Sequence, residues 1–395
     1  MKTKKSIRVT KALLICMIAA FMMSNTATVK AGDDKIVIGK KVTIQSKALD
    51  EERTMLVYLP KSYDLTSSNY PVMYLLDGGY HFHHATGIVQ FLSSQGLMPE
   101  IIVVAITNVD RGRDFTPTKI EKKPTTGGAD KFMSFLSDEL VPYIDKNYRT
   151  QPYNILTGHS LGGTFAAYAF LAQPETFDAY IAISPYLAYD ENLLVKKAET
   201  GLKSSYNNSK QFYMTLGDEP DYFESVENFT KIVKSNSPEG LEFSYVVMKD
   251  ENHGSIPHLS IYNGLESIYS EWQLPKEEYA EGLASIDNHH KSLSEKYGYE
   301  IETPEYTING LGYYYLGKKE NIDKAIKVLK ENVKRFPASA NVYDSLGEAY
   351  EKSGQTEKAE KNYKKAVEIA EKEEHPYLKV YKQNLNRVQE NLVEK

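Results

Sequence analysis

Short, nearly continuous apolar runs alternate with longer amphipathic stretches through the middle of the chain. Such runs are typical of strands buried on both faces of a sheet. They occur at residues 72–76, 101–106, 153–157, 180–184, 212–216 and 243–247. Helical spacing follows between them, for example at 131–146 and 222–234, and two earlier runs, 41–46 and 54–59, predict a starting pair of strands. The alternation predicts an α/β fold with a doubly wound, mostly parallel sheet.

The pattern changes after Trp272, where strand signals stop and the chain becomes charged and helical. Two segments there resemble each other at the period of tetratricopeptide repeats. The second matches the spacing of that repeat at Tyr343, Leu346, Gly347, Tyr350, Ala359, Tyr363 and Ala366, and the first at Leu311, Gly312, Tyr315, Ala325, Leu329 and Pro337. We therefore expect an α/β domain at 32–275, a linker helix at 276–304, and a small all-α, tetratricopeptide-like domain at 305–395.

Two roles fit this helical module. It could offer a groove to a peptide or protein partner, or it could be a cap that packs on the larger domain and shapes its entrance. Two repeats are fewer than the three or so that normally stand alone. We favour the cap, and expect it to lean on the larger domain through the helix around Tyr279–Tyr299.

One motif carries the chemistry: Gly-His-Ser-Leu-Gly-Gly at residues 158–163. It follows the apolar run at 153–157 and precedes a small, apolar stretch with helical spacing. A Gly-x-Ser-x-Gly that closes a strand and opens a helix is typical of the nucleophile elbow of α/β-hydrolases. The elbow makes Ser160 the candidate nucleophile.

A general base and an acid should then follow in the order serine, acid, histidine. His253 lies in a polar turn after the strand-like run at 241–248, where this fold carries its base. His258 is the rival, but it falls within the next expected helix. The base would take the proton of Ser160 on attack and return it to the leaving group.

The acid is expected in the turn after the strand at 211–216. Glu219 is the first choice, Asp218 the second and Asp221 the third, and a Ser–His pair without a third member stays open. The oxyanion hole should combine two backbone N–H groups. Leu161 would supply one and Gly79 the other, with Gly78 or Tyr80 as alternatives.

The chain resembles the esterase D and enterochelin-esterase group of α/β-hydrolases, and within it the periplasmic siderophore-esterase type. The resemblance rests on residues 74–78, 158–163 and 252–255, and on the loop Asn-Val-Asp-Arg-Gly-Arg-Asp-Phe-Thr-Pro at 108–117. It covers about residues 35–275 and implies a serine carboxylic-ester hydrolase. The substrates implied range from siderophores to feruloyl and simple acyl esters.

Three further residues are candidates for substrate binding: Arg111, Arg113 and His159. The two arginines could contact an anionic or catechol-bearing substrate, or could form ion pairs with Asp114 that brace their loop. His81-Phe82-His83-His84 looks like a metal cluster, but it has no acidic or cysteine partner at ligand spacing. We therefore expect no metal and no cofactor.

The N-terminus has the composition of a secretory signal. Basic residues precede an apolar stretch at 12–23, and Val29-Lys30-Ala31 offers a cleavage site. The stretch is short for a membrane span, and Ile15 before Cys16 argues against a lipid anchor. Cleavage after Ala31 would leave a chain without cysteine, exported to the periplasm or the medium, with no stable membrane anchor.

Charge narrows the choice of partners. The mature chain would carry 41 basic and 53 acidic residues, a net charge of −12, which does not favour nucleic acid. The sequence thus predicts an exported serine esterase that acts on a small-molecule ester, with a protein partner at the repeats as an option. Two alternatives remain: an acyltransferase with the same site, and a repeat-mediated binding protein on an inactive hydrolase scaffold.

Overall fold

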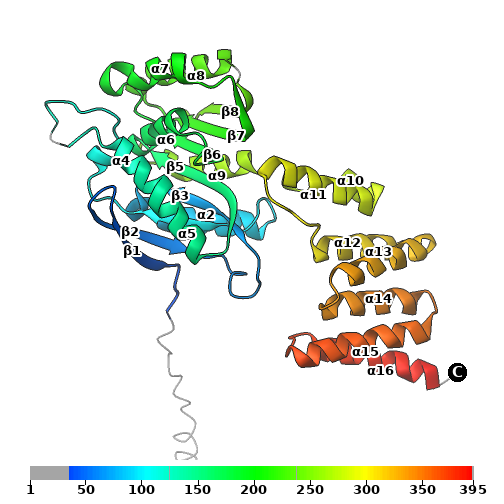
Figure 1. Cartoon of the computed structure of the whole chain (residues 1–395). Helices are drawn as coiled ribbons and strands as arrows, with labels where there is room; N and C mark the ends of the chain where they lie inside the picture. Colours follow the sequence, from blue (N-terminus) through cyan, green and yellow to red (C-terminus); the bar gives the residue numbers. More distant parts are fainter. Residues whose placement is uncertain (1–34, 124, 237, 394–395) are drawn as a thin grey trace, which may run out of the picture. The chain divides into compact units, whose positions relative to one another are not determined.

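The computed structural model describes residues 35–123, 125–236 and 238–393. Within them, eight strands form one sheet in the order β1-β2-β4-β3-β5-β6-β7-β8 (Figure 1). β1 and β2 pair antiparallel, as do β2 and β4, and the pairs from β4 to β8 are parallel. The strands are β1 (Lys40–Ser46), β2 (Glu51–Tyr58), β3 (Tyr70–Leu75), β4 (Ile102–Ile106), β5 (Thr150–His159), β6 (Ala179–Ile183), β7 (Ser205–Leu216) and β8 (Glu239–Val247). The predicted doubly wound, mostly parallel sheet is confirmed.

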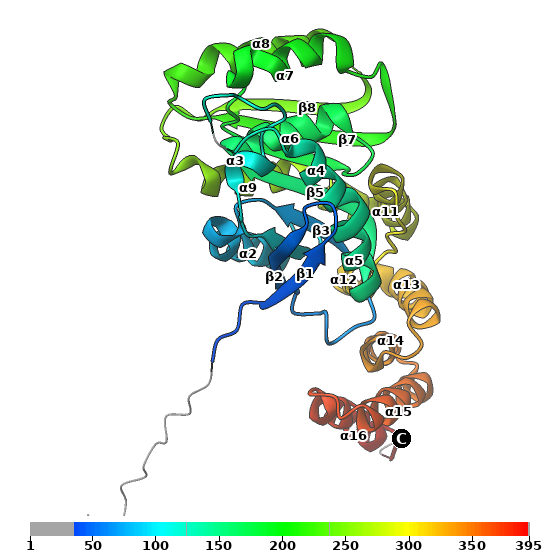
Figure 2. The same ribbon diagram turned by 60° about the vertical axis from the view of Figure 1, so that its left-hand side comes forward.

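Helices cover both faces of the sheet because its strands are apolar on both sides. Alternate residues of β3 show this: Val72 and Tyr74 join one buried cluster, and Met73 and Leu75 the other. The first cluster includes side chains from α4 (Ala129–Ser134), α5 (Val141–Asn147), α6 (Leu161–Ala172), α7 (Tyr189–Gly201) and α8 (Pro220–Asn236). The second includes α2 (Gly78–Ser94) and α9 (Ile256–Ile268), which contact each other (Figure 2).

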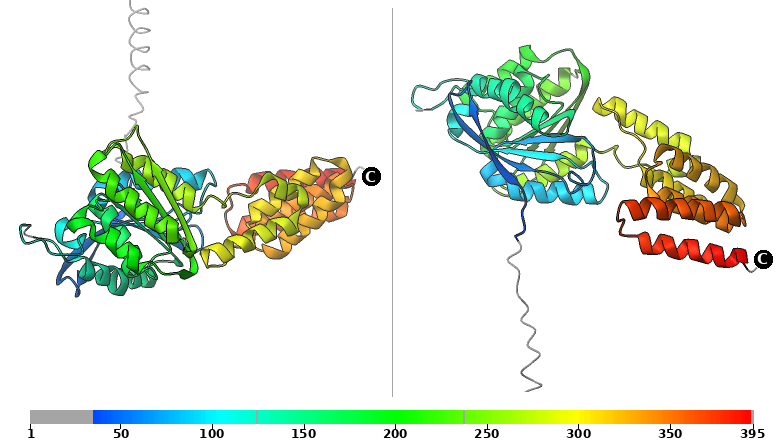
Figure 3. Two further views of the ribbon diagram at one scale, coloured as in Figure 1. Left: turned by 90° about the horizontal axis from the view of Figure 1, so that it is seen from above. Right: turned by 60° about the horizontal axis from the view of Figure 1, so that its bottom comes forward.

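The C-terminal part is helical, as predicted. Successive helices pack against one another from α12 onward (Figure 3). They are α12 (Glu305–Leu316), η2 (Lys319–Asn321), α13 (Ile322–Arg335), α14 (Ala340–Lys352), α15 (Thr356–Lys372) and α16 (Leu378–Val393). The glycines of the repeat pattern permit this packing: a Cβ on Gly347 would lie 2.8 Å from the ring of Tyr363, and one on Gly312 2.5 Å from Leu329.

The expected linker helix is two helices, α10 (Lys276–Glu281) and α11 (Leu283–Tyr297). Ile286 of α11 packs with Ile308 and Leu311 of α12. Leu293 and Tyr297 instead enter the second cluster of the sheet, where the ring of Tyr297 lies 5.3 Å from that of Tyr153. α11 therefore contributes to the hydrophobic cores of both parts of the chain.

Two details differ from the sequence prediction, or lie beyond it. The helix expected at 131–146 is interrupted by a π-helical segment, η1 (Phe135–Leu140), between α4 and α5. The predicted signal segment, 1–31, lies outside the described residues. Among the residues that are described, none of the helices has the length and apolar character needed to cross a bilayer.

Candidate active site

Ser160 stands at a sharp turn between β5 and α6. Its φ of 59° and ψ of −119° lie outside the regions that L-residues favour, and its N–H donates to the Ile183 carbonyl at 2.9 Å. The neighbouring glycines allow the strand and helix to approach: a Cβ on Gly158 would lie 2.2 Å from the Gly162 carbonyl oxygen. These features are the strained strand–turn–helix that a nucleophile elbow requires.

Tyr222, near the start of α8, carries no sequence motif that marks it as part of the site. Its phenol lies close enough to the side chain of Ser160 for the serine to affect its pKa. Burial raises the pKa of the Tyr222 phenol, and the contact with Ser160 opposes this rise only in part, so the hydroxyl keeps its proton. The tyrosine ring also lies edge-on to His253, with centroids 5.6 Å apart. Tyr222 thus links the candidate nucleophile to the candidate base.

His253 lies on the loop between β8 and α9, as predicted. Its Nδ1 hydrogen-bonds to Oε1 of Glu219, whose side chain is only 8% exposed, while that of His253 is 42% exposed. The other ring nitrogen, Nε2, is left for a different partner. Asn252 shapes this loop, because its side-chain oxygen accepts from the N–H groups of Gly254 and Ser255 at 2.9 and 3.2 Å.

The second oxygen of Glu219 is held as well. Oε2 accepts from the Ser184 hydroxyl and, at 3.1 Å, from the Gly217 N–H. Ser184 follows β6 with a φ of 40°, a conformation that few residues adopt without a compensating contact. Of the three acidic candidates the structure brings Glu219 to His253, whereas Asp218 and Asp221 are exposed.

The loop after β3 leads into α2 at Gly78. The N–H groups of Gly78 and Gly79, at the start of α2, have no acceptor within the helix, and the side chain of Asp77 does not cap them. The N–H of Tyr80 donates to the Asp77 carbonyl, which leaves Tyr80 a poorer oxyanion donor than Gly78 or Gly79. Gly79 is exposed, and a Cβ there would meet nothing within 4 Å. Leu161 is likewise the first residue of a helix, α6, without a side-chain cap.

Arg111 joins three loops at this edge of the sheet. Its Nε donates to Asp77 at 2.6 Å, and Nη2 donates to the His159 carbonyl at 3.0 Å. Asp77 also accepts from Asn108 at 2.6 Å. The loops after β3, β4 and β5 are therefore tied together beside Ser160.

Arg113 lies in an ion-pair network. Of the two roles that the sequence left open for this arginine, the structure shows ion pairs that brace the loop. The Nε of Arg113 donates to Asp114 at 2.7 Å, and its guanidinium also binds Glu51. The hydrogen bond to Arg113 lowers the pKa of Glu51. Arg53 and Asp114 pair at 2.6 Å with 0% and 1% of their side chains exposed. Contact of Arg113 or Arg111 with substrate stays a prediction.

His159 begins a row of histidine rings that passes through His81 and His84 to His258. Ring centroids of His159 and His253 are 4.5 Å apart, and Nδ1 of His81 lies 2.9 Å from Nε2 of His84. Burial, reinforced by its histidine neighbours, lowers the pKa of His159 to about 3 and that of His84 to about 4. His258 lies inside α9, as expected. Its ring packs on that of His84, with centroids 5.5 Å apart. In the part of the chain that is described, no three His, Cys, Asp or Glu side chains converge as metal ligands would.

Comparison with known proteins agrees with the fold. Residues 46–238 match the model of the family described as "Putative esterase", and residues 340–373 match a tetratricopeptide repeat. The ferri-bacillibactin esterase of Bacillus subtilis is 28% identical over 200 residues, 45% of this chain and 69% of that protein. A siderophore triacetylfusarinine C esterase of Aspergillus fumigatus is 23% identical over 240 residues, 51% of this chain and 82% of its own.

A solved structure resembles most of the chain. An IroE-like serine hydrolase from Shewanella oneidensis is 26% identical, with a TM-score of 0.65 over 75% of this chain and 99% of that one. Fold, motifs and comparisons lead to one assignment. Residues 46–238 are similar to the esterase family of α/β-hydrolases, with siderophore esterases among the relatives, and a match to a tetratricopeptide repeat follows toward the C-terminus.

Proposed function

We propose that this protein is an exported serine esterase in which Ser160 attacks the ester carbonyl. The Oγ of Ser160 would bond to the carbonyl carbon while Nε2 of His253 takes its proton. Collapse of the tetrahedral intermediate would break the bond to the alcohol, which leaves with that proton. His253 would then take a proton from water, which attacks the acyl-enzyme. Breakage of the bond to Oγ would release the acid and return the proton to Ser160.

The contact between Glu219 and His253 carries this proposal. A carboxylate on Nδ1 keeps a proton there, so Nε2 is the free acceptor that Ser160 needs, and it stabilises the imidazolium formed on attack. The two additional donors on Oε2, from Ser184 and Gly217, fix the orientation of the Glu219 carboxylate toward the ring. A scaffold without catalysis would have no use for a carboxylate so placed.

The negative charge that develops on the carbonyl oxygen would be held by the N–H groups of Leu161 and Gly79. Both belong to the first turn of a helix, where N–H groups are free and the helix dipole favours an anion. The bond from Arg111 to Asp77 and to the His159 carbonyl supports their relative position, because it joins the two loops that carry them.

For the substrate we propose an ester of a siderophore type. Two relatives bear the names of siderophore esterases. Beside Ser160, the rings of Tyr222 and Tyr186 lie 5.2 Å apart, and Tyr80 next to Gly79 is exposed. Such aromatic surfaces suit the flat catechol or aryl groups that such esters carry. His159 and Arg111 would line the same entrance.

The test uses the mature chain, residues 32–395, with short p-nitrophenyl acyl esters and a catecholate trilactone. We expect hydrolysis that Ser160→Ala abolishes, and covalent labelling of Ser160 by a fluorophosphonate. Turnover that survives in Ser160→Ala, or a folded protein that neither hydrolyses these esters nor takes the label, would refute the proposal. Release of the mature chain from cells that express residues 1–395, with Gly32 as its first residue, tests export.

A further inference from the structure

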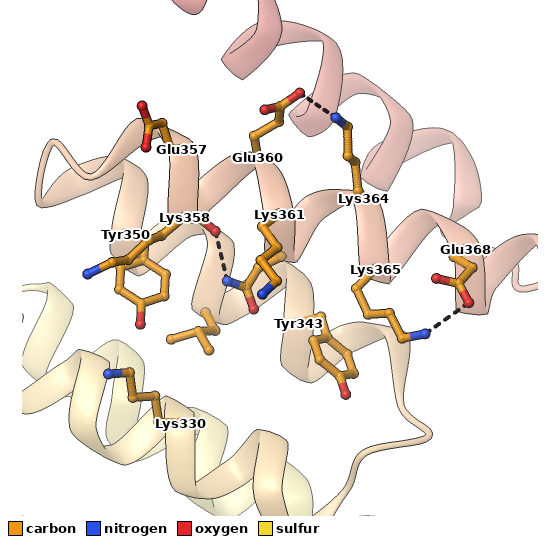
Figure 4. A pocket seen from close by; sticks show the side chains of 12 residues that line it. Lys330, Tyr343, Tyr350, Glu357, Lys358, Glu360, Lys361, Lys364, Lys365 and Glu368 are labelled. Atoms are coloured by element: carbon orange, nitrogen blue, oxygen red, sulfur yellow. Dashed lines mark hydrogen bonds and ion pairs between the residues drawn. The ribbon is translucent and has the colours of Figure 1, made fainter.

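A groove of about 820 Å³ lies on the repeats between α13, α14 and α15 (Figure 4). Its floor is made by one face of α14, because Tyr343, Leu346 and Tyr350 follow one another at helical spacing. Leu346 and Tyr350 are buried and Tyr343 is half-buried. The rim holds lysines from α13 and α15. The hollow is thus apolar at its base and charged at its edge.

The lysines of the rim are only partly neutralised. Lys364 pairs with Glu360 at 2.7 Å, and Lys365 pairs with Glu368 at 2.9 Å. Three further lysines have no carboxylate partner among the described residues: Lys330, Lys358 and Lys361.

The positions of these three lysines converge on the floor. The ammonium groups of Lys330 and Lys358 lie 5.8 and 5.5 Å from the ring centroid of Tyr350. Lys361 projects from α15 toward the space between Tyr350 and Tyr343, while the carboxylate of Glu357 points away from it (Figure 4). Three cations therefore surround an aromatic and aliphatic surface.

We propose that this groove binds an acidic peptide segment with at least one apolar side chain. Carboxylates of the peptide would pair with Lys330, Lys358 and Lys361, and its apolar side chain would rest on Tyr350 and Leu346. Charge complementarity favours this occupant: the chain has 53 acidic and 47 basic residues, so an acidic partner is repelled elsewhere and attracted here. A long polyanion such as nucleic acid would extend beyond the groove and meet the acidic surface. The proposal does not depend on the esterase activity.

The test measures fluorescence anisotropy of the mature chain with a fluorescein-labelled octapeptide pool. In these peptides every second residue is glutamate, and the residues between are Leu, Ile, Phe or Tyr in random order. A second pool has lysine in place of each glutamate. The groove variant is Lys330→Glu with Lys361→Glu. The matched control is Lys61→Glu with Lys379→Glu, two exposed lysines outside the groove that make the same change in net charge. Thermal unfolding and circular dichroism establish that both variants are folded.

We expect the glutamate pool to bind, and to bind about tenfold more weakly to the groove variant but equally well to the control. The binding should also weaken with added salt. Equal loss in both variants, preference for the lysine pool, or no binding of the glutamate pool at about 1 mM protein would overturn the proposal. So would concentration-dependent dimerisation that the groove variant abolishes, since the occupant would then be a second copy.

Discussion

Replacement of Glu219 by glutamine tests the proposed mechanism most directly, because the surroundings decide which way the new amide must turn. The Gly217 N–H is a fixed donor to Oε2, and the Ser184 hydroxyl donates to the same atom. The oxygen of the new amide has to face these donors, since an NH₂ group placed there would meet the Gly217 N–H. The NH₂ group then faces Nδ1 of His253.

An amide that donates to Nδ1 requires Nδ1 to be without a proton, so the proton moves to Nε2. In that tautomer His253 cannot accept the proton of Ser160. We expect Glu219→Gln to lower kcat by about four orders of magnitude, about 5 kcal/mol of transition-state stabilisation, with KM changed less than about threefold. The fold should be kept, because the side chain has the same size and its oxygen keeps the two donors.

The assay is steady-state hydrolysis of p-nitrophenyl butyrate, with circular dichroism as a check of folding. Asp218→Asn is the matched control: the neighbouring carboxylate is exposed, and its loss should change kcat less than about twofold. Ser184→Ala leaves Gly217 and His253 in place and should cost about tenfold or less. A Glu219→Gln variant within about tenfold of the native kcat, or a larger loss in Asp218→Asn, would refute the reasoning.

Three further predictions follow from the packing and the charges. Gly158→Ala would put a Cβ 2.2 Å from the Gly162 carbonyl oxygen, and should destabilise the fold by about 3 kcal/mol or more in urea unfolding, whereas Gly87→Ala, with nothing within 4 Å, should be neutral or stabilising by about 0.5 kcal/mol. Equal losses in the two variants would contradict this account. Asp114→Asn removes the buried one of the two carboxylates that pair with the fully buried Arg53 and leaves only Glu51, so it should cost about 2 kcal/mol, while Lys364→Ala at an exposed pair should cost less than about 0.5 kcal/mol in the same measurement. His84 has a pKa lowered to about 4, so the unfolded chain binds a proton at this residue from about pH 6.5 downward and the folded chain does not. The free energy of unfolding should therefore fall as the pH is lowered from about 6.5 to about 4, by about 1 kcal/mol after solvent screening. His84→Gln should show a shallower fall, and an unchanged slope in that variant would count against the lowered pKa of His84.

The parts of the site that could be predicted are those that local sequence decides. The elbow at Ser160 is specified by glycines at fixed spacing, and the loops of His253 and Glu219 each follow an apolar strand, so the parallel sheet brings them to one edge. The choice among Glu219, Asp218 and Asp221 could not be made in this way. All three lie in one short turn, and which of them turns inward depends on Ser184 and Gly217, whose contacts exist only in the folded chain.

Tyr222 illustrates the other limit. It is three residues after Glu219, at the start of an amphipathic helix, where a tyrosine has no distinctive pattern. Its contact with Ser160 arises because β5 and β7 run parallel on either side of β6, so the residues that follow them meet at one edge of the sheet. The position of Tyr222 three residues after the candidate acid Glu219 is the one feature of the sequence that could have suggested a place in the site. The roles of Arg111 and Arg113 could not be predicted either, because a guanidinium pairs with a carboxylate of the protein in the same way as with an anionic group of a substrate.

The position of α11 has a consequence for how the chain acquires its structure during synthesis. Tyr297 packs with Tyr153 and Tyr269, so the cluster on this face of the sheet includes residues made long after the elbow at Ser160. A chain that ends with α9 lacks Tyr269 and Tyr297, so the ring of Tyr153 is without these two partners. Since domains fold as units, this face closes only when the chain is available as far as α11. By then the first helices of the repeats are being made, and the hydrolase is complete only as its C-terminal neighbour begins to form.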